Sequence, residues 1–229
     1  MEFLKQNDAR FPRKESVLKD QKILFCGDSI CAASVYDYKD CTFWGWAGRI
    51  ASATGAEYIN LGRDGASLST CRGENRILTQ IEKAKDEKFD LVVLHGGVND
   101  AWDSNAAGRM TDSFDLKDFD VTTCAGGLEE LFYHAKRYFP DTKLCFVLNF
   151  AGPSCKIGRI SNMDEYFDEI LKICQKWEIQ VLDLYHDAGF EKEFKPAEKI
   201  NTADFIHPVG SGYDILYRYI LSFLEGLYL

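Results

Sequence analysis

Residues 22–29, KILFCGDS, are the starting point for predicting the fold of this chain. The apolar run at 22–26 is short and continuous, which is typical of a strand buried on both faces of a parallel sheet. Gly27 ends the run and permits a tight turn, so Asp28 and Ser29 come at the start of a predicted helix. The segment therefore predicts a strand that delivers polar side chains to one edge of a sheet.

The same pattern recurs along the chain. Four further apolar runs are predicted as strands at 57–61, 90–95, 143–149 and 179–184. Stretches with helical spacing occur at 43–54, 73–87, 121–139, 162–177 and 210–227. This alternation predicts an α/β fold with a five-stranded parallel sheet and helices on both of its faces. We expect an N-terminal arm or short outer helix over residues 1–21 and a single domain over 22–229.

Composition excludes several classes of protein. The chain has 229 residues, 46% of them hydrophobic, and a net charge of −9 without a dense Lys/Arg cluster, so nucleic-acid binding is not expected. No apolar run is long enough to span a bilayer, and the first residues lack the apolar core of a secretory signal, which favours a cytoplasmic protein without stable membrane insertion. The eight cysteines show no C-x-x-C spacing and are interpreted mostly as reduced, buried side chains.

Two segments near the ends of the chain carry the residue types that acyl transfer needs. Ser29 is the candidate nucleophile, and the run DFIHP at 204–208 supplies Asp204 and His207. A carboxylate three residues before a histidine can orient one ring nitrogen while the other accepts the serine proton. Each segment also has an ordinary interpretation, because Asp28 and Ser29 could simply cap a helix and Asp204 could cap the last one.

Two further segments could supply hydrogen bonds to a developing oxyanion. Gly65 lies in the run NLGRDG at 60–65, and Asn99 lies in GGVND at 96–100. A backbone N–H at Gly65 and the side-chain amide of Asn99 would suit this role. The alternatives are a turn glycine and an Asx-turn residue, and Asp100 is interpreted as a structural turn residue.

Substrate contacts are harder to infer. Trp102, Asp28 and Cys31 are candidates because of their positions next to the other blocks. The long connection at 101–120, with Phe114 and Phe119, could cover the site, since loops of this length are often functional. Trp44 and Trp46 are interpreted first as core residues. The four histidines lack the spacing of a metal site and no nucleotide-binding motif occurs, so neither metal nor cofactor is expected.

Taken together, the four segments resemble the blocks of the SGNH hydrolases, also called the GDSL esterase/lipase family. The run ILFCGDSI at 23–30 is similar to the nucleophile block, although Ile30 stands where the family has leucine. The resemblance implies a three-layer α/β/α sandwich similar to flavodoxin. It also implies Ser29 as nucleophile, His207 as base and Asp204 as acid, with an oxyanion hole formed by the N–H groups of Ser29 and Gly65 and the side chain of Asn99.

The function expected from the residues and the resemblance is that of a metal-independent serine esterase acting on a small-molecule ester. A short-chain or carbohydrate-linked acyl ester is favoured over the alternative of a lysophospholipase or thioesterase with a longer acyl chain. A non-catalytic module that binds an anionic ligand at the turn 27–29 remains a second alternative. The oligomeric state is not predicted.

Overall fold

The computed structural model describes residues 1–33, 45–103, 105–150, 163–195, 198 and 200–229. Five parallel strands form one sheet in the order β2-β1-β3-β4-β5. They are β1 (Lys22–Cys26), β2 (Glu57–Asn60), β3 (Leu91–Gly96), β4 (Lys143–Leu148) and β5 (Gln180–Asp183). The predicted five-stranded parallel sheet is confirmed.

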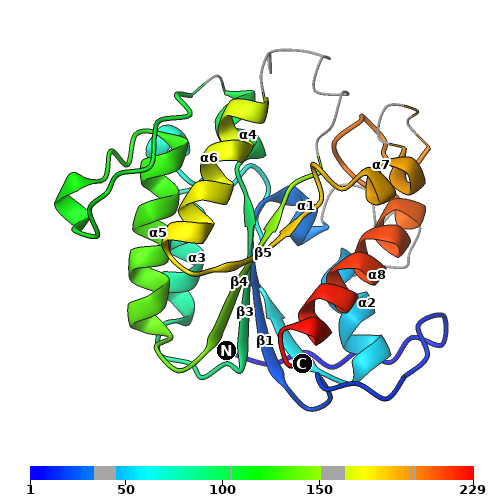
Figure 1. Ribbon diagram of the computed structural model, residues 1–229. Helices are drawn as coiled ribbons and strands as arrows, with labels where there is room; N and C mark the ends of the chain where they lie inside the picture. Colours follow the sequence, from blue (N-terminus) through cyan, green and yellow to red (C-terminus); the bar gives the residue numbers. More distant parts are fainter. Residues whose placement is uncertain (34–44, 104, 151–162, 196–197, 199) are drawn as a thin grey trace.

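Helices cover both faces of this sheet, as Figure 1 shows. One face carries α2 (Gly45–Thr54) and α8 (Gly210–Gly226), which pack on each other. The other carries α3 (Ile77–Ala84), α5 (Cys124–Tyr138) and α6 (Met163–Lys176). Two short helices, α1 (Ser29–Ala32) and α4 (Val98–Trp102), follow β1 and β3 directly. The predicted three-layer α/β/α architecture is therefore confirmed.

Burial of the central strands explains their sequences. Every residue of β3 is buried, and positions 23–26 of β1 are 0% exposed. A strand covered by helices on both faces has no polar face, so its sequence is a continuous apolar run rather than an alternation. The apolar strands thus form the middle of one core that extends into both helical layers.

Residues 1–21 contain no helix and run along the outside of the sheet, which favours the arm over the short helix. Leu4 forms an antiparallel bridge with Tyr58 of the edge strand β2, through hydrogen bonds of 2.8 and 3.0 Å. This contact pairs backbone groups that an edge strand would otherwise expose. Both chain termini lie at the end of the molecule opposite α1 and α4 (Figure 1).

Helix boundaries differ from those predicted at several ends. Helix α3 starts at Ile77 rather than residue 73, because Gly73, which follows the 3₁₀ turn η2 (Thr70–Arg72), has φ +59° and Arg76 is extended. Helix α5 starts at Cys124, where the Thr123 hydroxyl accepts the Gly126 N–H and caps it. Helix α7 (Ala188–Phe194) was not predicted, although Asp187 caps it. Residues 43, 44 and 162 of the predicted helices lie outside the described residues, as do Cys41 and Cys155.

Residues 105–120, most of the connection 101–120 that was expected to cover the site, do not line the pocket that contains Ser29. Residues 105–120, including the short helix η3 (Leu116–Asp118), pack beside α5 and α6 (Figure 1). The Lys176 amine of α6 contacts Thr111 Oγ1, the Ser113 carbonyl and the buried Glu129 carboxylate. Phe119 is buried next to Trp177. Residues 105–120 are therefore held against these two helices and do not form the predicted covering loop.

The cysteines in the described parts of the chain follow the prediction. Six are free thiols, and all of these except the exposed Cys71 are buried. Burial raises the pKa of the Cys31 thiol well above its usual value. These buried thiols behave as small apolar side chains of the core.

Candidate active site

The site is built around the turn between β1 and α1. Ser29 is the first residue of α1, and Asp28 caps that helix by accepting the Ile30 N–H at 2.9 Å. Gly27 is required by close approach, because a Cβ there would lie 2.7 Å from the Cys31 Cβ and 2.8 Å from the His95 carbonyl oxygen. The turn thus places Ser29 at the carboxyl edge of the sheet, where open α/β sheets bind ligands.

The structure brings Asp204 and His207 to Ser29. The Nε2 atom of His207 lies 2.9 Å from Ser29 Oγ, and its Nδ1 atom lies 2.7 Å from Asp204 Oδ2. Because a carboxylate only accepts, Nδ1 carries the hydrogen and Nε2 can accept the Ser29 hydroxyl proton. Asp204 Oδ1 also accepts the backbone N–H groups of Ile206 and His207. Serine, histidine and carboxylate therefore form one continuous hydrogen-bonded chain.

The electrostatic interactions among Ser29, His207 and Asp204 favour the charged form of His207. Partial burial alone would raise the pKa of Asp204, but hydrogen bonds from the His207 ring and backbone lower it to about 2. Burial alone would lower the pKa of His207, but the hydrogen bond and charge of Asp204 raise it. The charges of Asp28 and Asp64 raise the pKa of His207 further. An imidazolium formed at His207 would thus be stabilised by nearby carboxylates.

A pocket of about 310 Å³ opens beside Ser29. Its walls combine residues of all four sequence blocks with Arg72 and Trp102: Ser29, Asp64, Gly65, Arg72, Val98, Asn99, Trp102, Asp204, Ile206 and His207. Asn99 is 9% exposed, and one hydrogen of its Nδ2 is donated to the Ala66 carbonyl at 2.9 Å. The structure therefore brings both proposed oxyanion residues and Trp102 to the pocket that contains Ser29.

The loop that carries Gly65 is held by two side chains that the sequence did not single out. Asn75 Nδ2 donates to the Asp64 carbonyl at 2.9 Å, and Arg72 Nη1 donates to the Gly65 carbonyl at 3.1 Å. Gly65 has φ +72°, and a Cβ there would lie 2.6 Å from Arg72 Nη1. Arg72 also pairs with both Asp103 oxygens, at 2.5 and 2.8 Å. No local pattern marks Arg72, because its contacts depend on the turn between Gly65 and α3.

Asp100 has the structural role that was predicted for it. It is 0% exposed, and its carboxylate accepts the backbone N–H groups of Leu68 and Ser69 together with the Ser69 hydroxyl. Burial raises the pKa of Asp100, and these hydrogen bonds oppose the shift. Asp100 thus connects the loop after β2, called here the glycine loop because it contains Gly65, to α4, the helix that carries Asn99.

Two of the predicted substrate contacts are wrong because their side chains point into the core. Asp28 and Cys31 are both 0% exposed and do not line the pocket. Cys31 Sγ instead lies 3.6 Å from Asn60 Oδ1. Trp46 is buried and donates to the Ile30 carbonyl, as its interpretation as a core residue requires. Trp44 lies outside the described residues.

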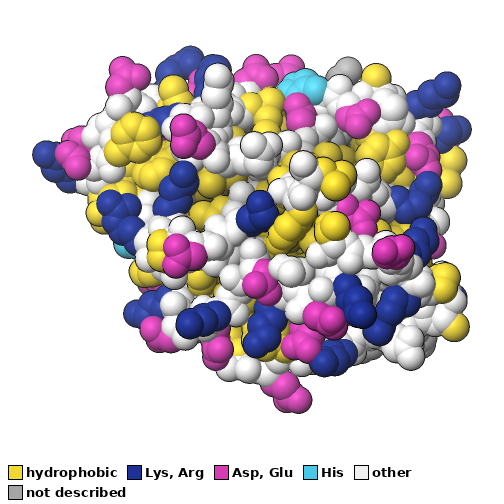
Figure 2. All heavy atoms as spheres, turned by 60° about the horizontal axis from the view of Figure 1, so that its bottom comes forward, with side chains coloured by type: hydrophobic (Ala, Val, Ile, Leu, Met, Phe, Trp, Pro, Cys, Tyr) yellow, Lys and Arg dark blue, Asp and Glu magenta, His cyan; other side chains and the backbone are white. Residues whose placement is uncertain are grey.

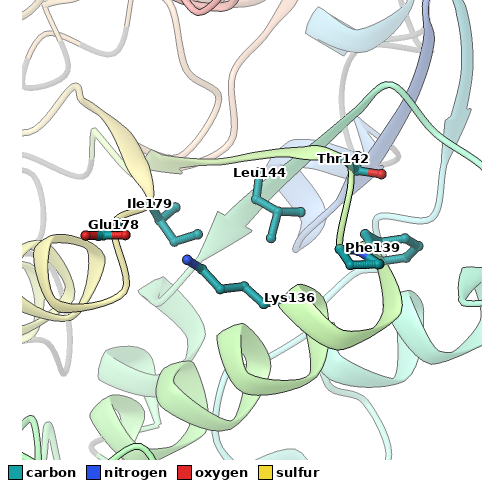
Figure 3. A pocket seen from close by; sticks show the side chains of 7 residues that line it. Lys136, Phe139, Thr142, Leu144, Glu178 and Ile179 are labelled. Carbon is teal, nitrogen blue, oxygen red and sulfur yellow. The ribbon is translucent and has the colours of Figure 1, made fainter.

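Other hollows lie at the opposite edge of the sheet. One of them has a volume of about 260 Å³. Its apolar residues Leu144 and Ile179 are flanked by Lys136 and Glu178 (Figure 3). The face at the amino ends of the strands carries Lys and Arg interspersed with Asp and Glu (Figure 2). These hollows contain none of the residues of the four sequence blocks.

Within the described part of the chain, no three His, Cys, Asp or Glu side chains are arranged to hold a metal ion. His95 lies in the core, where its Nδ1 donates to the Val147 carbonyl at 2.9 Å. No helix among the described residues combines the length and apolar character needed to cross a bilayer.

Comparison with known proteins places these observations in a family. The model of the GDSL-like lipase/acylhydrolase family matches residues 25–215, a range that includes Ser29, Gly65, Asn99 and His207. None of the curated proteins matches the chain.

Solved structures share the fold. A protein from Lactobacillus plantarum has 23% sequence identity and a TM-score of 0.75, with coverage of 92% of this chain and 99% of that one. A possible lipase from Chitinophaga pinensis has 18% identity and a TM-score of 0.70, over 90% and 98% of the two chains. A catalytic mutant of an acetylxylan esterase from Geobacillus stearothermophilus has 17% identity and a TM-score of 0.59, over 91% and 96%.

Proposed function

The chain belongs to the GDSL-like lipase/acylhydrolase family, and on that premise we propose that it is a serine esterase that forms an acyl-enzyme on Ser29. The observation that carries this proposal is the hydrogen-bonded chain from Ser29 Oγ through His207 to Asp204, with contacts of 2.9 and 2.7 Å. A helix cap needs no base beside its serine, so the binding-module alternative leaves this arrangement unexplained.

In the proposed reaction His207 acts alternately as base and acid. His207 Nε2 removes the Ser29 hydroxyl proton as Oγ attacks the ester carbonyl carbon, and Asp204 stabilises the imidazolium that results. When the carbon–oxygen bond of the ester breaks, the leaving alcohol takes this proton from His207. Water then gives a proton to His207 as it attacks the acyl carbon. The bond between this carbon and Ser29 Oγ breaks, Oγ takes the proton back from His207, and the carboxylic acid is released.

The negative oxygen of the tetrahedral intermediate would be bound by three donors. Asn99 Nδ2 carries two hydrogens, of which Ala66 takes one, so the other can be donated into the pocket. The N–H groups of Gly65 and Ser29 complete the proposed oxyanion hole. A donor that is held in place before the reaction costs little reorganisation, and Asn75 and Arg72 hold the loop of Gly65.

The pocket favours a short acyl group over a long one. Its volume of about 310 Å³ lies at the lower end of the range for small-molecule sites. Asp64, Arg72 and Asp204 add charged groups to its walls, whereas the alternative lysophospholipase or thioesterase would need a long apolar groove. We therefore propose a small, polar ester, such as a short-chain acyl ester of a carbohydrate.

A chromogenic ester series from acetyl to long acyl, measured without added metal, tests this proposal. We expect turnover by the wild type, highest for the shortest chains, and loss of turnover in Ser29→Ala. Ser222→Ala serves as a matched control, because it removes an exposed hydroxyl from α8. Turnover that survives in Ser29→Ala would contradict the proposal, and a maximum at long chains would favour the lysophospholipase or thioesterase alternative.

A further inference from the structure

Gln80 of α3, in the helical layer on one face of the sheet, holds the turn that carries Ser29. The Gln80 side chain is buried, with 3% of the residue exposed. Its Oε1 atom accepts the Gly27 N–H at 2.8 Å, and its Nε2 atom donates to the Gly27 carbonyl at 2.9 Å. One side-chain amide therefore pairs with both polar backbone groups of a single residue.

These two hydrogen bonds act at the most adaptable residue of the turn. Glycine has the widest range of backbone conformations, and Gly27 lies two residues before Ser29. The N–H and carbonyl of Gly27 belong to the peptide groups on either side of its Cα atom. Gln80 consequently fixes the orientation of both peptides, and with them the direction in which the chain enters α1.

The Gly27 carbonyl is also shared with the glycine loop. Besides the Gln80 amide, it accepts the Arg63 N–H at 3.0 Å. Arg63 lies two residues before Gly65, so this one carbonyl joins the nucleophile turn to the loop of the oxyanion hole. Movement at Gly27 would therefore change the position of Ser29 relative both to His207 and to Gly65.

We propose that Gln80 is a positioning residue that aligns Ser29 with His207 and Gly65 through the backbone of Gly27. This inference rests on the proposed function, because alignment has a kinetic effect only if Ser29 is the nucleophile. A simpler role, in which Gln80 only satisfies buried backbone groups, would affect stability without a specific effect on turnover.

The variant Gln80→Met separates the two roles, because it keeps the length of the side chain and removes the amide. At a temperature well below unfolding, we expect kcat on the best ester to fall about tenfold to a hundredfold, since small misplacements of reacting groups have effects of this size. KM should change less than about threefold, because Gln80 does not line the pocket. The control Ile81→Val removes a buried methyl group from the same helix and leaves the amide in place.

A kcat for Gln80→Met within twofold of wild type would overturn the proposal. A fall in kcat for Ile81→Val as large as that for Gln80→Met would overturn it as well. Gln80→Glu keeps an acceptor for the Gly27 N–H, so its kcat should lie between those of wild type and Gln80→Met. If Gln80→Met does not fold, a kcat for Gln80→Glu equal to that of wild type would overturn the proposal.

Amide hydrogen exchange of a peptide that includes residues 24–31 gives a readout that does not depend on activity. We expect faster exchange in this peptide for Gln80→Met and unchanged exchange for Ile81→Val. If the wild type hydrolyses no ester, the proposed function fails, and exchange alone then decides whether Gln80 fixes the turn. Unchanged exchange in Gln80→Met would overturn the inference in either case.

Discussion

Two turns in this molecule have the same Asp-x-x-His sequence and the same pattern of local hydrogen bonds. In one, Asp204 Oδ2 lies 2.7 Å from His207 Nδ1, and Oδ1 accepts the N–H groups of Ile206 and His207. In the other, Asp183 Oδ2 lies 2.7 Å from His186 Nδ1, and Oδ1 accepts the N–H groups two and three residues on. A carboxylate–histidine pair is therefore a local product of this spacing.

The turns differ in what the second ring nitrogen faces. His207 Nε2 lies 2.9 Å from the Ser29 hydroxyl, whereas His186 Nε2 lies 3.8 Å from the carboxylate of Asp168. The first arrangement can transfer a proton from a nucleophile, and the second can form only an ion pair. The comparison shows that the serine hydroxyl placed by the tertiary structure, and not the Asp–His pair itself, distinguishes the candidate active site.

Replacing the two histidines gives the largest expected difference. His207→Ala should lower kcat/KM by about 10⁴-fold or more, because the base is lost. His186→Ala should leave kcat/KM within about twofold of wild type, since it removes surface contacts with Asp183 and Asp168 that lie outside the pocket. Steady-state kinetics on one ester measures both, and comparable losses in the two variants would break the distinction between the turns.

The two carboxylates give the next largest difference. Asp204→Asn should lower kcat by about 10³- to 10⁴-fold, because the amide no longer holds the required tautomer of His207 or stabilises its charge. Asp183→Asn makes the same chemical change in the second turn and should have almost no kinetic effect. An equal loss of kcat in both would show that the Asp183 turn also contributes to the reaction.

The surroundings of Ser29 sharpen the comparison further. Asn99 lines the pocket that also contains Ser29 and His207. Asn99→Ala should lower kcat by about 10²-fold, the usual effect of losing one oxyanion donor. KM should change little, because the donor acts mainly on the charge that develops during reaction. A change confined to KM would instead assign Asn99 to substrate binding.

The pH dependence has the smallest expected effect. Only the neutral imidazole accepts the serine proton, so kcat/KM should rise with pH through the pKa of His207, which lies above its usual value of 6.5. Because the charge of Asp204 raises this pKa, residual activity in Asp204→Asn should rise at a lower pH than in wild type. A pH–rate profile measures both, and a flat profile between pH 5 and 8 would contradict the role of His207.

Most of the fold could be predicted because its signals are local. The buried strands are continuous apolar runs, and β1 occupies the predicted residues 22–26. Helix ends were less accurate, because the Thr123 cap and the non-helical residues 73–76 shorten two periodic stretches. The unpredicted helix α7 is short, so its pattern of two buried phenylalanines was too brief to identify.

The surroundings of the site were predicted less well. Asp28 and Cys31 are close in sequence to Ser29, but the tight turn directs both side chains into the core. The connection at 105–120 has the length of a covering loop, yet the buried Glu129 and the Lys176 amine hold it against α5 and α6. Gln80 contacts the site through the backbone of the distant Gly27, and Arg72 lines the pocket and donates to the Gly65 carbonyl. No local sequence pattern around either residue predicts these contacts.

The sequence by itself determined the strands and the Asp–His pairs, because each depends on interactions between residues close in the chain. It also determined the order of the four blocks directly. The tertiary structure alone decided which pair meets a serine. Ser29 and His207 are 178 residues apart, and the parallel sheet brings the end of β1 to the segment before α8. Such contacts depend on how all the layers pack, so the same four-residue pattern forms part of a candidate catalytic site beside β1 and only a surface contact between histidine and carboxylates after β5.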